Sequence, residues 1–286
     1  MNAAKRPNRN EAREKARQQA RSLSAQSSAR DKRGRLLTQI GLGIAAVTVI
    51  GILAAVILEG TKPAGPGPLN MASDGIKIGA EYKAVKTDAL PADAKPVATP
   101  ENSADIVDIT IFVDFLCPIC GEFEAVNGAS INDLVARGSA TIEIHPLAFL
   151  DNLSQGTQYS TRAANAIACL ANYVPDSVLE MNNELFANQP AENTPGLSDE
   201  QIIALAEKVG ANEQAIACIE DQDFKSWVGA STARAMGGTL AINNLDPSFT
   251  KISGTPTVLI NGVPFKYSYP FNNEEFLSAI LAAAGQ

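Results

Sequence analysis

The feature that most constrains this chain is a pair of cysteines, Cys117 and Cys120, placed where an apolar strand gives way to a helix. Residues 106–116 are rich in β-branched and aromatic side chains and predict a buried strand. The stretch from Gly121 to about Arg137 can be helical, so Cys117 falls at a helix N-terminus. Unpaired backbone N–H groups and the helix dipole favour a thiolate there. The spacing brings the second sulfur within reach of the first, as a dithiol–disulfide centre requires.

Charge divides the chain sharply. Residues 1–35 hold 11 Lys or Arg and 3 acidic residues, a net +8, and the remainder holds 12 basic and 28 acidic residues, a net −16. Between them, residues 36–58 form an uncharged run of 23 residues, enough to span a bilayer core of roughly 30 Å. A cleaved signal peptide has a shorter apolar core and a small-residue cleavage site, and this run shows no such site at its exit. We therefore predict an uncleaved, single-pass anchor, and cleavage stays the alternative.

The basic arm before the apolar run predicts a cytoplasmic N-terminus and an extracytoplasmic C-terminal domain, held at the cell membrane. Nucleic-acid binding is the weaker interpretation of this arm, because it lies directly before the span and lacks interleaved aromatic residues. All four cysteines lie beyond residue 116, on the side of the membrane where disulfides persist. The cysteine distribution supports the same topology.

The predicted organisation has four parts. Residues 1–35 predict a basic, disordered or loosely helical cytoplasmic tail, and residues 36–58 a transmembrane helix. Residues 59–75 are rich in Pro and Gly and predict a linker that holds the domain off the membrane. Residues 76–286 can bury one core, with a helical insertion at about 156–237.

The domain predicts an α/β order of elements. Strands are expected around 76–85, at 106–116, 140–147 and 257–260, and, after an Asn261–Gly262 type I′ turn, at 263–267. Helices are expected after the cysteine motif, at 160–173, 176–188, 198–209, 212–219 and 221–236, and at 273–284. Ser198 and Gln201 have the spacing of a capping box.

This order of elements resembles the thioredoxin fold of the disulfide bond protein A (DsbA) family, in its membrane-anchored Gram-positive or actinobacterial form. Residues 117–120, Cys-Pro-Ile-Cys, are similar to the family's Cys-Pro-x-Cys motif, and residues 112–116 to the Asp-aromatic approach of Gram-positive members. Residues 254–257 resemble the family's Gly-Thr-Pro-Thr segment. The resemblance spans about 76–286 and implies a thioredoxin-like fold with an inserted helical domain and thiol–disulfide oxidoreductase activity.

The motif suggests a role for each of its residues. Cys117 is the expected nucleophile at the helix start, and Cys120, about one turn inside, resolves the mixed disulfide. Pro118 suits the first helical turn, where its missing N–H group is not needed. Ile119 stands where the best-known members have His, and it supplies neither positive charge nor a hydrogen bond. We therefore predict a less acidic Cys117 and a less oxidising centre than in those relatives.

The resemblance also implies that the Thr255–Pro256 peptide bond is cis and faces the Cys117 sulfur. The backbone of Thr255 could then pair with an extended substrate segment. The residues alone would predict a trans bond, because most X-Pro bonds in folded proteins are trans.

Two further polar residues are candidates for tuning the pair. Asp114, three residues before Cys117, either only ends the strand or faces solvent, or it raises the pKa of Cys117 as a nearby carboxylate, and both interpretations stay open. His145, near the end of the second strand, could act as the base of a thiol hydrolase. Cys120 would oxidise Cys117 and disable such an enzyme, so a strand-end His satisfied by solvent or backbone is favoured. Tuning of the redox pair by His145 stays open.

The other two cysteines, Cys169 and Cys218, lie 49 residues apart in predicted helices. They could be buried free thiols, but an exported domain favours a structural disulfide between them. Closing a loop of that length contributes about 4 kcal/mol in the chain-entropy model. A zinc site needs about four ligands, and the chain offers one Cys-x-x-Cys pair, two isolated cysteines and one His, so we predict no metal.

These observations predict an extracytoplasmic oxidoreductase that introduces or exchanges disulfides in unfolded or reduced exported proteins. No cofactor is expected, because the two sulfurs store the electrons, and the family implies a quinone-linked membrane partner as re-oxidant. A disulfide reductase or isomerase is an alternative, since 30 mV of potential corresponds to only about 1.4 kcal/mol. A non-redox binding or chaperone module on the same fold is the alternative from another functional class.

Overall fold

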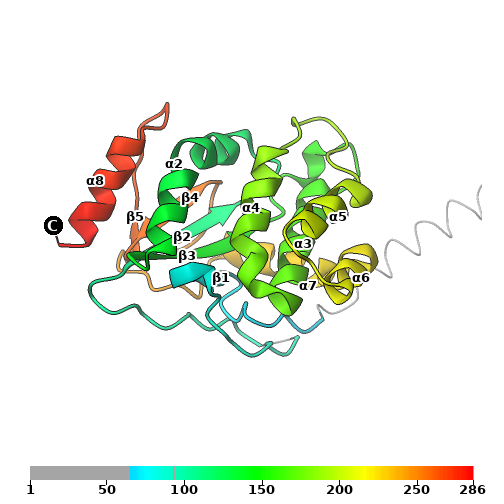
Figure 1. Cartoon of the computed structure of the whole chain (residues 1–286), viewed down its shortest axis with the longest axis horizontal. Helices are drawn as coiled ribbons and strands as arrows, with labels where there is room; N and C mark the ends of the chain where they lie inside the picture. Colours follow the sequence, from blue (N-terminus) through cyan, green and yellow to red (C-terminus); the bar gives the residue numbers. More distant parts are fainter. Residues whose placement is uncertain (1–64, 93, 286) are drawn as a thin grey trace, which may run out of the picture. The chain divides into compact units, whose positions relative to one another are not determined.

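A computed structural model describes residues 65–92 and 94–285, which belong to one compact unit (Figure 1). The predicted tail at 1–35 and the predicted transmembrane helix at 36–58 lie outside the described residues. Among the helices that are described, none has the length and apolar character needed to cross a bilayer.

A five-stranded mixed sheet forms the centre of the domain (Figure 1). In spatial order its strands are β1 (Ile76–Ile78), β3 (Ala140–Pro146), β2 (Val107–Val113), β4 (Thr257–Ile260) and β5 (Val263–Pro264). β2 and β3 run parallel, because the long helix α2 (Pro118–Ala136) carries the chain back between them. The other three neighbouring pairs are antiparallel.

A lobe of five helices is inserted between β3 and β4 and stands beside the sheet (Figure 1). The helices are α3 (Tyr159–Tyr173), α4 (Val178–Ala187), α5 (Asp199–Lys208), α6 (Glu213–Asp221) and α7 (Lys225–Gly237). α3 is the buried centre of the lobe, and α4 packs against α2. The C-terminal helix α8 (Asn273–Ala283) packs against α2 and β4.

The side chains of β2 alternate between two apolar clusters. Ile111 and Val113 join the main core with α2 and α3, whereas Phe112 points to a smaller cluster with Leu147 and Ile252. Both faces of this strand are therefore covered, which explains its nearly continuous apolar sequence. The motif that follows β2 begins from a strand that packing holds on both sides.

The predicted α/β order is confirmed, and so are two local predictions. Asn261 and Gly262 both have positive φ, 47° and 74°, as a type I′ turn requires. The capping box of α5 is formed, with Ser198 accepting from the Gln201 N–H and the Gln201 side chain accepting from the Ser198 N–H.

Several element bounds differ from those predicted. The strand predicted at 106–116 ends at Val113, because Asp114 folds the next residues into a turn through its side chain and its carbonyl. The strand predicted at 263–267 is limited to Val263–Pro264. The helix predicted at 221–236 begins at Lys225, because Gln222, with φ of 52°, ends α6 in the left-handed conformation.

The folded unit also begins before Ile76, where the sequence predicts its boundary. Met71 is 1% exposed, and the Asn70 side chain donates to the carbonyl of Ala171 on α3. Asp74 forms an ion pair with Arg234 on α7, at 2.6 Å. The part of the predicted 59–75 linker that the structure describes therefore packs on the domain, because it carries a core methionine and specific polar partners.

Candidate active site

The cysteine motif lies where the chain passes from the end of β2 into the first turn of α2. Cys117 is the N-cap residue of α2 and Pro118 its first residue, so the missing N–H of proline falls where no helical partner exists. Neither cysteine forms a disulfide in this structure, and both are buried, with Cys117 6% and Cys120 1% exposed. Cys117 is the more accessible sulfur of the two.

The two thiols have opposite pKa shifts. The hydrogen bond from Cys120, helped by Thr255 and by the backbone N–H groups of Cys120 and Ile119, outweighs burial and lowers the pKa of Cys117 from 9.0 to about 6. Burial raises the pKa of Cys120 well above its usual value, and the neighbouring Cys117 raises it further. At neutral pH the pair is therefore one thiolate and one thiol, the form in which Cys117 is a nucleophile.

The loop before β4 meets the motif from the other side. The Thr255–Pro256 bond is cis, and Cys117 Sγ lies 3.3 Å from the Thr255 carbonyl, to which it donates when it is protonated. The Tyr267 hydroxyl donates to the Pro256 carbonyl at 3.1 Å and holds this loop in place. Burial and the two cysteines raise the pKa of Tyr267, so it stays a donor at neutral pH. The structure thus brings together residues that lie 138 positions apart in sequence.

Asp114 is completely buried under the motif, which excludes the interpretation in which it faces solvent. Its carboxylate accepts hydrogen bonds from the Leu116 N–H, the Leu150 N–H and the Ser160 hydroxyl, each between 2.7 and 2.8 Å. Burial nevertheless raises the pKa of Asp114 to about 6. Asp114 therefore ties the turn before Cys117 to the loop after β3 and to α3.

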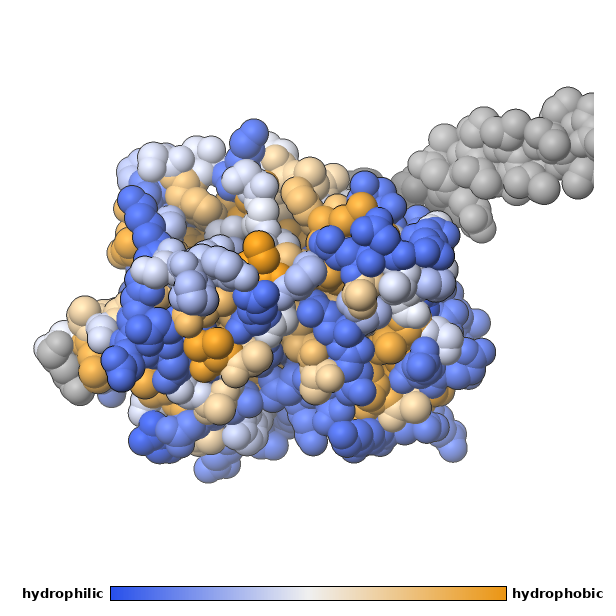
Figure 2. Space-filling model, turned by 90° about the horizontal axis from the view of Figure 1, so that it is seen from above, coloured by the Kyte–Doolittle hydropathy of each residue, from blue (hydrophilic) through white to orange (hydrophobic). Residues whose placement is uncertain are grey.

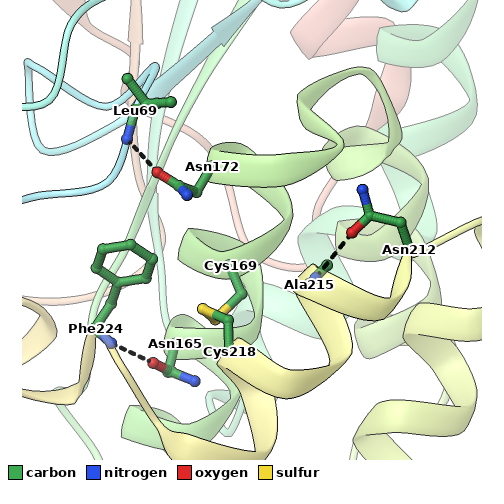
Figure 3. Close-up of a disulfide and its surroundings, with 8 residues drawn as sticks. All are labelled: Leu69, Asn165, Cys169, Asn172, Asn212, Ala215, Cys218 and Phe224. Carbon is green, nitrogen blue, oxygen red and sulfur yellow. Dashed lines mark hydrogen bonds between the residues drawn. A yellow bond between two sulfur atoms is a disulfide. The ribbon is translucent and has the colours of Figure 1, made fainter.

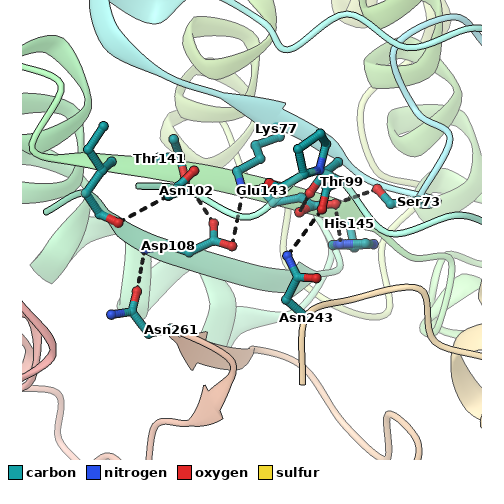
Figure 4. A network of polar contacts seen from close by, with 12 residues as sticks. Ser73, Lys77, Thr99, Asn102, Asp108, Thr141, Glu143, His145, Asn243 and Asn261 are labelled. Atoms are coloured by element: carbon teal, nitrogen blue, oxygen red, sulfur yellow. Dashed lines mark hydrogen bonds and ion pairs between the residues drawn. The ribbon is translucent and has the colours of Figure 1, made fainter. Parts of the chain in front are cut away.

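His145 lies in a different polar cluster (Figure 4). It is 2% exposed, its ring stacks on Phe112 at 4.3 Å, and its Nε2 is 3.4 Å from Glu143 Oε1. The idea of a strand-end His satisfied by solvent is therefore wrong, because the ring is buried against an aromatic side chain and a carboxylate. Within the described residues, no hydrogen bond joins His145 to Cys117 or Cys120.

Glu143 organises the cluster around His145. It accepts hydrogen bonds from the hydroxyls of Ser73 and Thr99, which belong to segments before β2 (Figure 4). Burial favours the neutral acid, but the partners His145, Ser73 and Thr99 outweigh it and lower the pKa of Glu143. This cluster fastens the N-terminal segment to β3.

Sequence reasoning missed Gln189, just after α4. Its Nε2 donates to the carbonyls of Phe115 and Cys117, at 3.1 and 2.8 Å. One signal in the sequence pointed to such a contact, because Gly121 stands inside a helix directly after Cys120 and glycine is a poor helix residue. The identity of the partner could not be read from the sequence, since it comes from the inserted lobe.

The second pair of cysteines forms a disulfide between α3 and α6 (Figure 3). The Cα atoms of Cys169 and Cys218 are 5.8 Å apart, within the usual range for a disulfide. Asn165 on α3 accepts from the Phe224 N–H beside the bond. This pairing is the one that the sequence favours, and it lies within the helical lobe.

The surface around the motif carries exposed apolar and aromatic groups. Ile119 is 43% exposed, and Tyr269 is 63% exposed with its hydroxyl donating to Glu122 of α2 at 2.7 Å. On the face shown in Figure 2, apolar residues form separate patches among hydrophilic ones. In the part of the chain that is described, no three His, Cys, Asp or Glu side chains gather in a way that could hold a metal ion.

The family of the chain follows from its match to a family model. The thioredoxin model matches residues 101–281, well over half of the chain. The chain belongs to the thioredoxin family. This match confirms the thioredoxin-like α/β fold predicted from the sequence, and the solved structures described next confirm the DsbA-like resemblance. The predicted transmembrane helix lies outside the described residues.

Solved structures with a similar fold are thiol–disulfide oxidoreductases. The reduced disulfide bond oxidoreductase DsbG of Mycobacterium tuberculosis is 26% identical, with a TM-score of 0.52 over 68% of this chain and 86% of that chain. Reduced DsbA of Mycobacterium tuberculosis is 24% identical, with a TM-score of 0.54 over 74% and 93%. MdbA of Corynebacterium diphtheriae is 19% identical, with a TM-score of 0.52 over 78% and 94%. The last two likenesses show the fold alone.

A curated relative matches part of the chain. The serine/threonine-protein kinase PknE of Mycobacterium tuberculosis is 30% identical over an alignment of 160 residues that covers 49% of this chain. The match covers 28% of the length of PknE. The chain therefore spans about a quarter of that protein.

Proposed function

We propose that this chain is a membrane-anchored, extracytoplasmic thiol–disulfide oxidoreductase that introduces or exchanges disulfides in unfolded or reduced exported proteins. The observation that carries the proposal is the unequal pair at the start of α2. Cys117 is the N-cap residue beside the cis Thr255–Pro256 loop, Cys120 is buried inside the first turn, and the pKa values of the two thiols shift in opposite directions. Such a pair has one attacking or leaving sulfur and one buried sulfur that completes the exchange.

The reaction follows from the two sulfurs. In the oxidised enzyme, a substrate thiolate attacks Cys117 Sγ, the bond to Cys120 breaks, and Cys120 leaves and takes up a proton. The mixed disulfide is then attacked, at the substrate sulfur, by a second thiolate of the substrate. A disulfide forms in the substrate, which loses two electrons, and Cys117 is released as the thiolate that the helix N-terminus stabilises.

The pKa of Cys117 favours disulfide donation. Related motifs span pKa values from about 3.5 in strong oxidants to about 7 in thioredoxin, and a value of about 6 falls between them. A stabilised thiolate stabilises the reduced enzyme and makes the disulfide a better oxidant. Ile119 adds no charge to that stabilisation, which agrees with a centre weaker than Cys-Pro-His-Cys relatives. Reductase or isomerase activity is the alternative direction for the same pair.

Two observations support an extracytoplasmic location. The uncharged run at 36–58 is long enough to anchor the chain, with a basic arm before it that favours a cytoplasmic N-terminus. The Cys169–Cys218 disulfide suits an oxidising compartment. Each turnover leaves two electrons on the enzyme, so a re-oxidant is required, and a quinone-linked membrane protein fits this chemistry.

An exchange assay tests the redox part of the proposal. Oxidised full-length chain in detergent is mixed with a reduced, unfolded protein, and the free thiols of both are counted by alkylation. Disulfides should appear in the substrate as the enzyme gains two thiols. With a disulfide-containing substrate in place of the reduced one, the Cys117 thiolate of a reduced Cys120→Ala variant should attack the substrate disulfide and release one substrate thiolate, so that a mixed disulfide accumulates because Cys120 is absent to resolve it. If Cys117 and Cys120 neither cycle nor exchange, the oxidoreductase proposal fails and the non-redox binding module takes its place.

Protease treatment of cells tests the location separately. Intact cells with a permeable outer layer should lose the C-terminal domain to an added protease and keep a fragment that contains residues 1–58. Full protection of the domain in intact cells, together with its digestion after lysis, would contradict the proposed topology.

A further inference from the structure

We propose that Gln189, which the helical lobe supplies, is a positioning residue that sets the redox equilibrium of the Cys117–Cys120 pair by clamping two backbone carbonyls of the active-site turn. The inference rests on the proposed function, because it assigns a task within the same redox site. It goes further by giving the inserted lobe a direct part in the chemistry.

The clamp is a single amide group that reaches two acceptors. Gln189 Nε2 donates to the Cys117 carbonyl at 2.8 Å and to the Phe115 carbonyl at 3.1 Å. A side-chain NH2 group has two hydrogens, so both bonds can form at once. The Cys117 carbonyl also accepts the first helical bond, from the Gly121 N–H at 3.2 Å. The N-cap carbonyl therefore has both lone pairs occupied.

Gly121 provides the space that the clamp needs. A Cβ atom built on Gly121 would overlap Gln189 Oε1 and lie 3.0 Å from its Cδ, so the end of the Gln189 side chain would have to move away. Gly121 has a helical φ, so the backbone conformation does not require glycine at this position. A glycine in the first turns of a helix lowers its stability. The close approach of the Gln189 amide explains why this helix carries one.

The clamp acts on the sulfur through the backbone of the turn. The N–H groups of Ile119 and Cys120 belong to the first turn of α2, directly after the N-cap residue Cys117, and they help to lower the pKa of Cys117. Gln189 holds the carbonyls on either side of that turn, so that their oxygens are bound to the amide. Without the amide, the Phe115 carbonyl would lose its donor, the Cys117 carbonyl would keep only the Gly121 N–H, and the turn would be held less firmly. The thiolate, and with it the reduced enzyme, would lose stabilisation.

Four variants of the full-length chain separate this role from a merely structural one. Gln189→Ala removes the amide, and Gln189→Glu keeps its shape but replaces the donor with a carboxylate that faces two carbonyls. Gly121→Ala displaces the amide by its Cβ. Asn188→Ala is the matched control, because Asn188 is exposed and bonds only to Glu184 within α4.

The readouts are the redox equilibrium with glutathione and the pH titration of thiolate absorbance, neither of which a purely structural contact would change. Loss of the clamp should lower the equilibrium constant that favours the reduced enzyme by roughly threefold to tenfold, as expected for a lost hydrogen bond. This corresponds to about 15–30 mV, because tenfold equals about 30 mV. The pKa of Cys117 should rise in the same variants, most in Gln189→Glu, and stay unchanged in Asn188→Ala.

A double variant tests the link between the two residues. In the Gln189→Ala background, Gly121→Ala should produce no further change in the redox equilibrium, because no amide remains to be displaced. In this background Gly121→Ala should raise the stability of the chain, since alanine suits a helix better than glycine, whereas in the wild-type background its Cβ displaces the amide and should lower the stability. Additive redox shifts in the double variant would refute the clamp.

The outcomes also separate this inference from the proposed function. If the wild-type chain exchanges disulfides while Gln189→Ala and Gln189→Glu keep its equilibrium and its thiolate titration, the clamp is refuted alone. If the wild-type chain exchanges no disulfides, the proposed function falls and the clamp falls with it. A variant that fails to fold is replaced by Gly121→Ser, which displaces the amide with a small polar side chain.

Discussion

Cys117 and Cys120 lie at the start of a helix, three positions apart, whereas Cys169 and Cys218 lie 49 positions apart inside two helices that pack together. Burial does not distinguish the pairs, because all four side chains are at most 6% exposed. What differs is the surrounding backbone. Helix-terminal N–H groups surround Cys117, while those around Cys169 are engaged in helical bonds.

This comparison shows why one pair is suited to exchange and the other to holding the lobe together. A thiolate at Cys117 has donors that stabilise it, so the bond to Cys120 can be made and broken. The Cys169–Cys218 bond joins the middle of α3 to α6 within the main apolar core, away from the N-terminus of either helix (Figure 3). The same residue type therefore serves two purposes within one domain.

The largest expected effect separates activity from stability. Cys117→Ser should reduce disulfide exchange to the background level, because the attacking sulfur is gone, and leave the fold intact. A Cys169→Ala/Cys218→Ala double variant should keep exchange activity. The measurement is the rate of disulfide transfer to a reduced peptide. Retention of exchange by Cys117→Ser would remove the distinction between the pairs.

The next effect is on the free energy of unfolding. Loss of the Cys169–Cys218 bond should lower it by about 4 kcal/mol, because the unfolded chain regains the freedom of a loop of 49 residues. Urea unfolding under oxidising conditions measures this value. A background in which Cys117 and Cys120 are both serine prevents new disulfide pairings. An unchanged midpoint in that background would show that packing alone holds α3 to α6.

Asp114, which supports the turn before Cys117, should make the free energy of unfolding depend on pH. The pKa of Asp114 is raised from 3.8 to about 6, so the folded chain binds a proton more tightly there than the unfolded chain does. Its contribution to stability is therefore fully present below about pH 4 and falls by up to about 3 kcal/mol as the pH rises to about 6.

This pH dependence can be assigned by a variant. Unfolding free energies of the oxidised chain, whose active-site thiols cannot titrate, are measured from pH 4 to pH 7 for wild type and Asp114→Asn. At pH 4 the variant is expected to be less stable than wild type, because one backbone donor loses its carboxylate partner. The difference should shrink toward pH 7, because the variant lacks this fall with pH. Equal slopes in the two proteins would contradict the raised pKa.

The smallest predicted effect concerns the strength of the oxidant. Ile119→His should raise the reduction potential of the pair by roughly 30 mV, a tenfold change in equilibrium, because a histidine can donate to the thiolate or carry positive charge beside it. Ile119 is 43% exposed, so the larger ring has room. The wild-type potential itself should lie below about −120 mV, the value of a strong oxidant, and a wild-type value near that would contradict the role of Ile119.

Local pattern was enough to predict much of the fold. The apolar run of β2, the proline at the start of α2 and the Asn261–Gly262 turn each depend on neighbouring residues, and the structure has all three. The N-terminal boundary of the domain, in contrast, is set by partners that are distant in the sequence. The packing of Met71 and the Asp74–Arg234 ion pair extend the domain toward the N-terminus, and no local pattern predicts them.

At the candidate site, the order of residues is enough to identify the atoms that could do chemistry. Two sulfurs at a helix start and a proline loop downstream follow from residue order and from the resemblance to DsbA. Tertiary structure decided what surrounds those atoms. Packing places Thr255 beside Cys117 and Gln189 of the inserted lobe beside the active-site turn. It places His145 next to the Glu143 carboxylate and not next to the cysteine pair. Long-range packing sets these distances, and electrostatic effects depend on distance far more than on order along the chain.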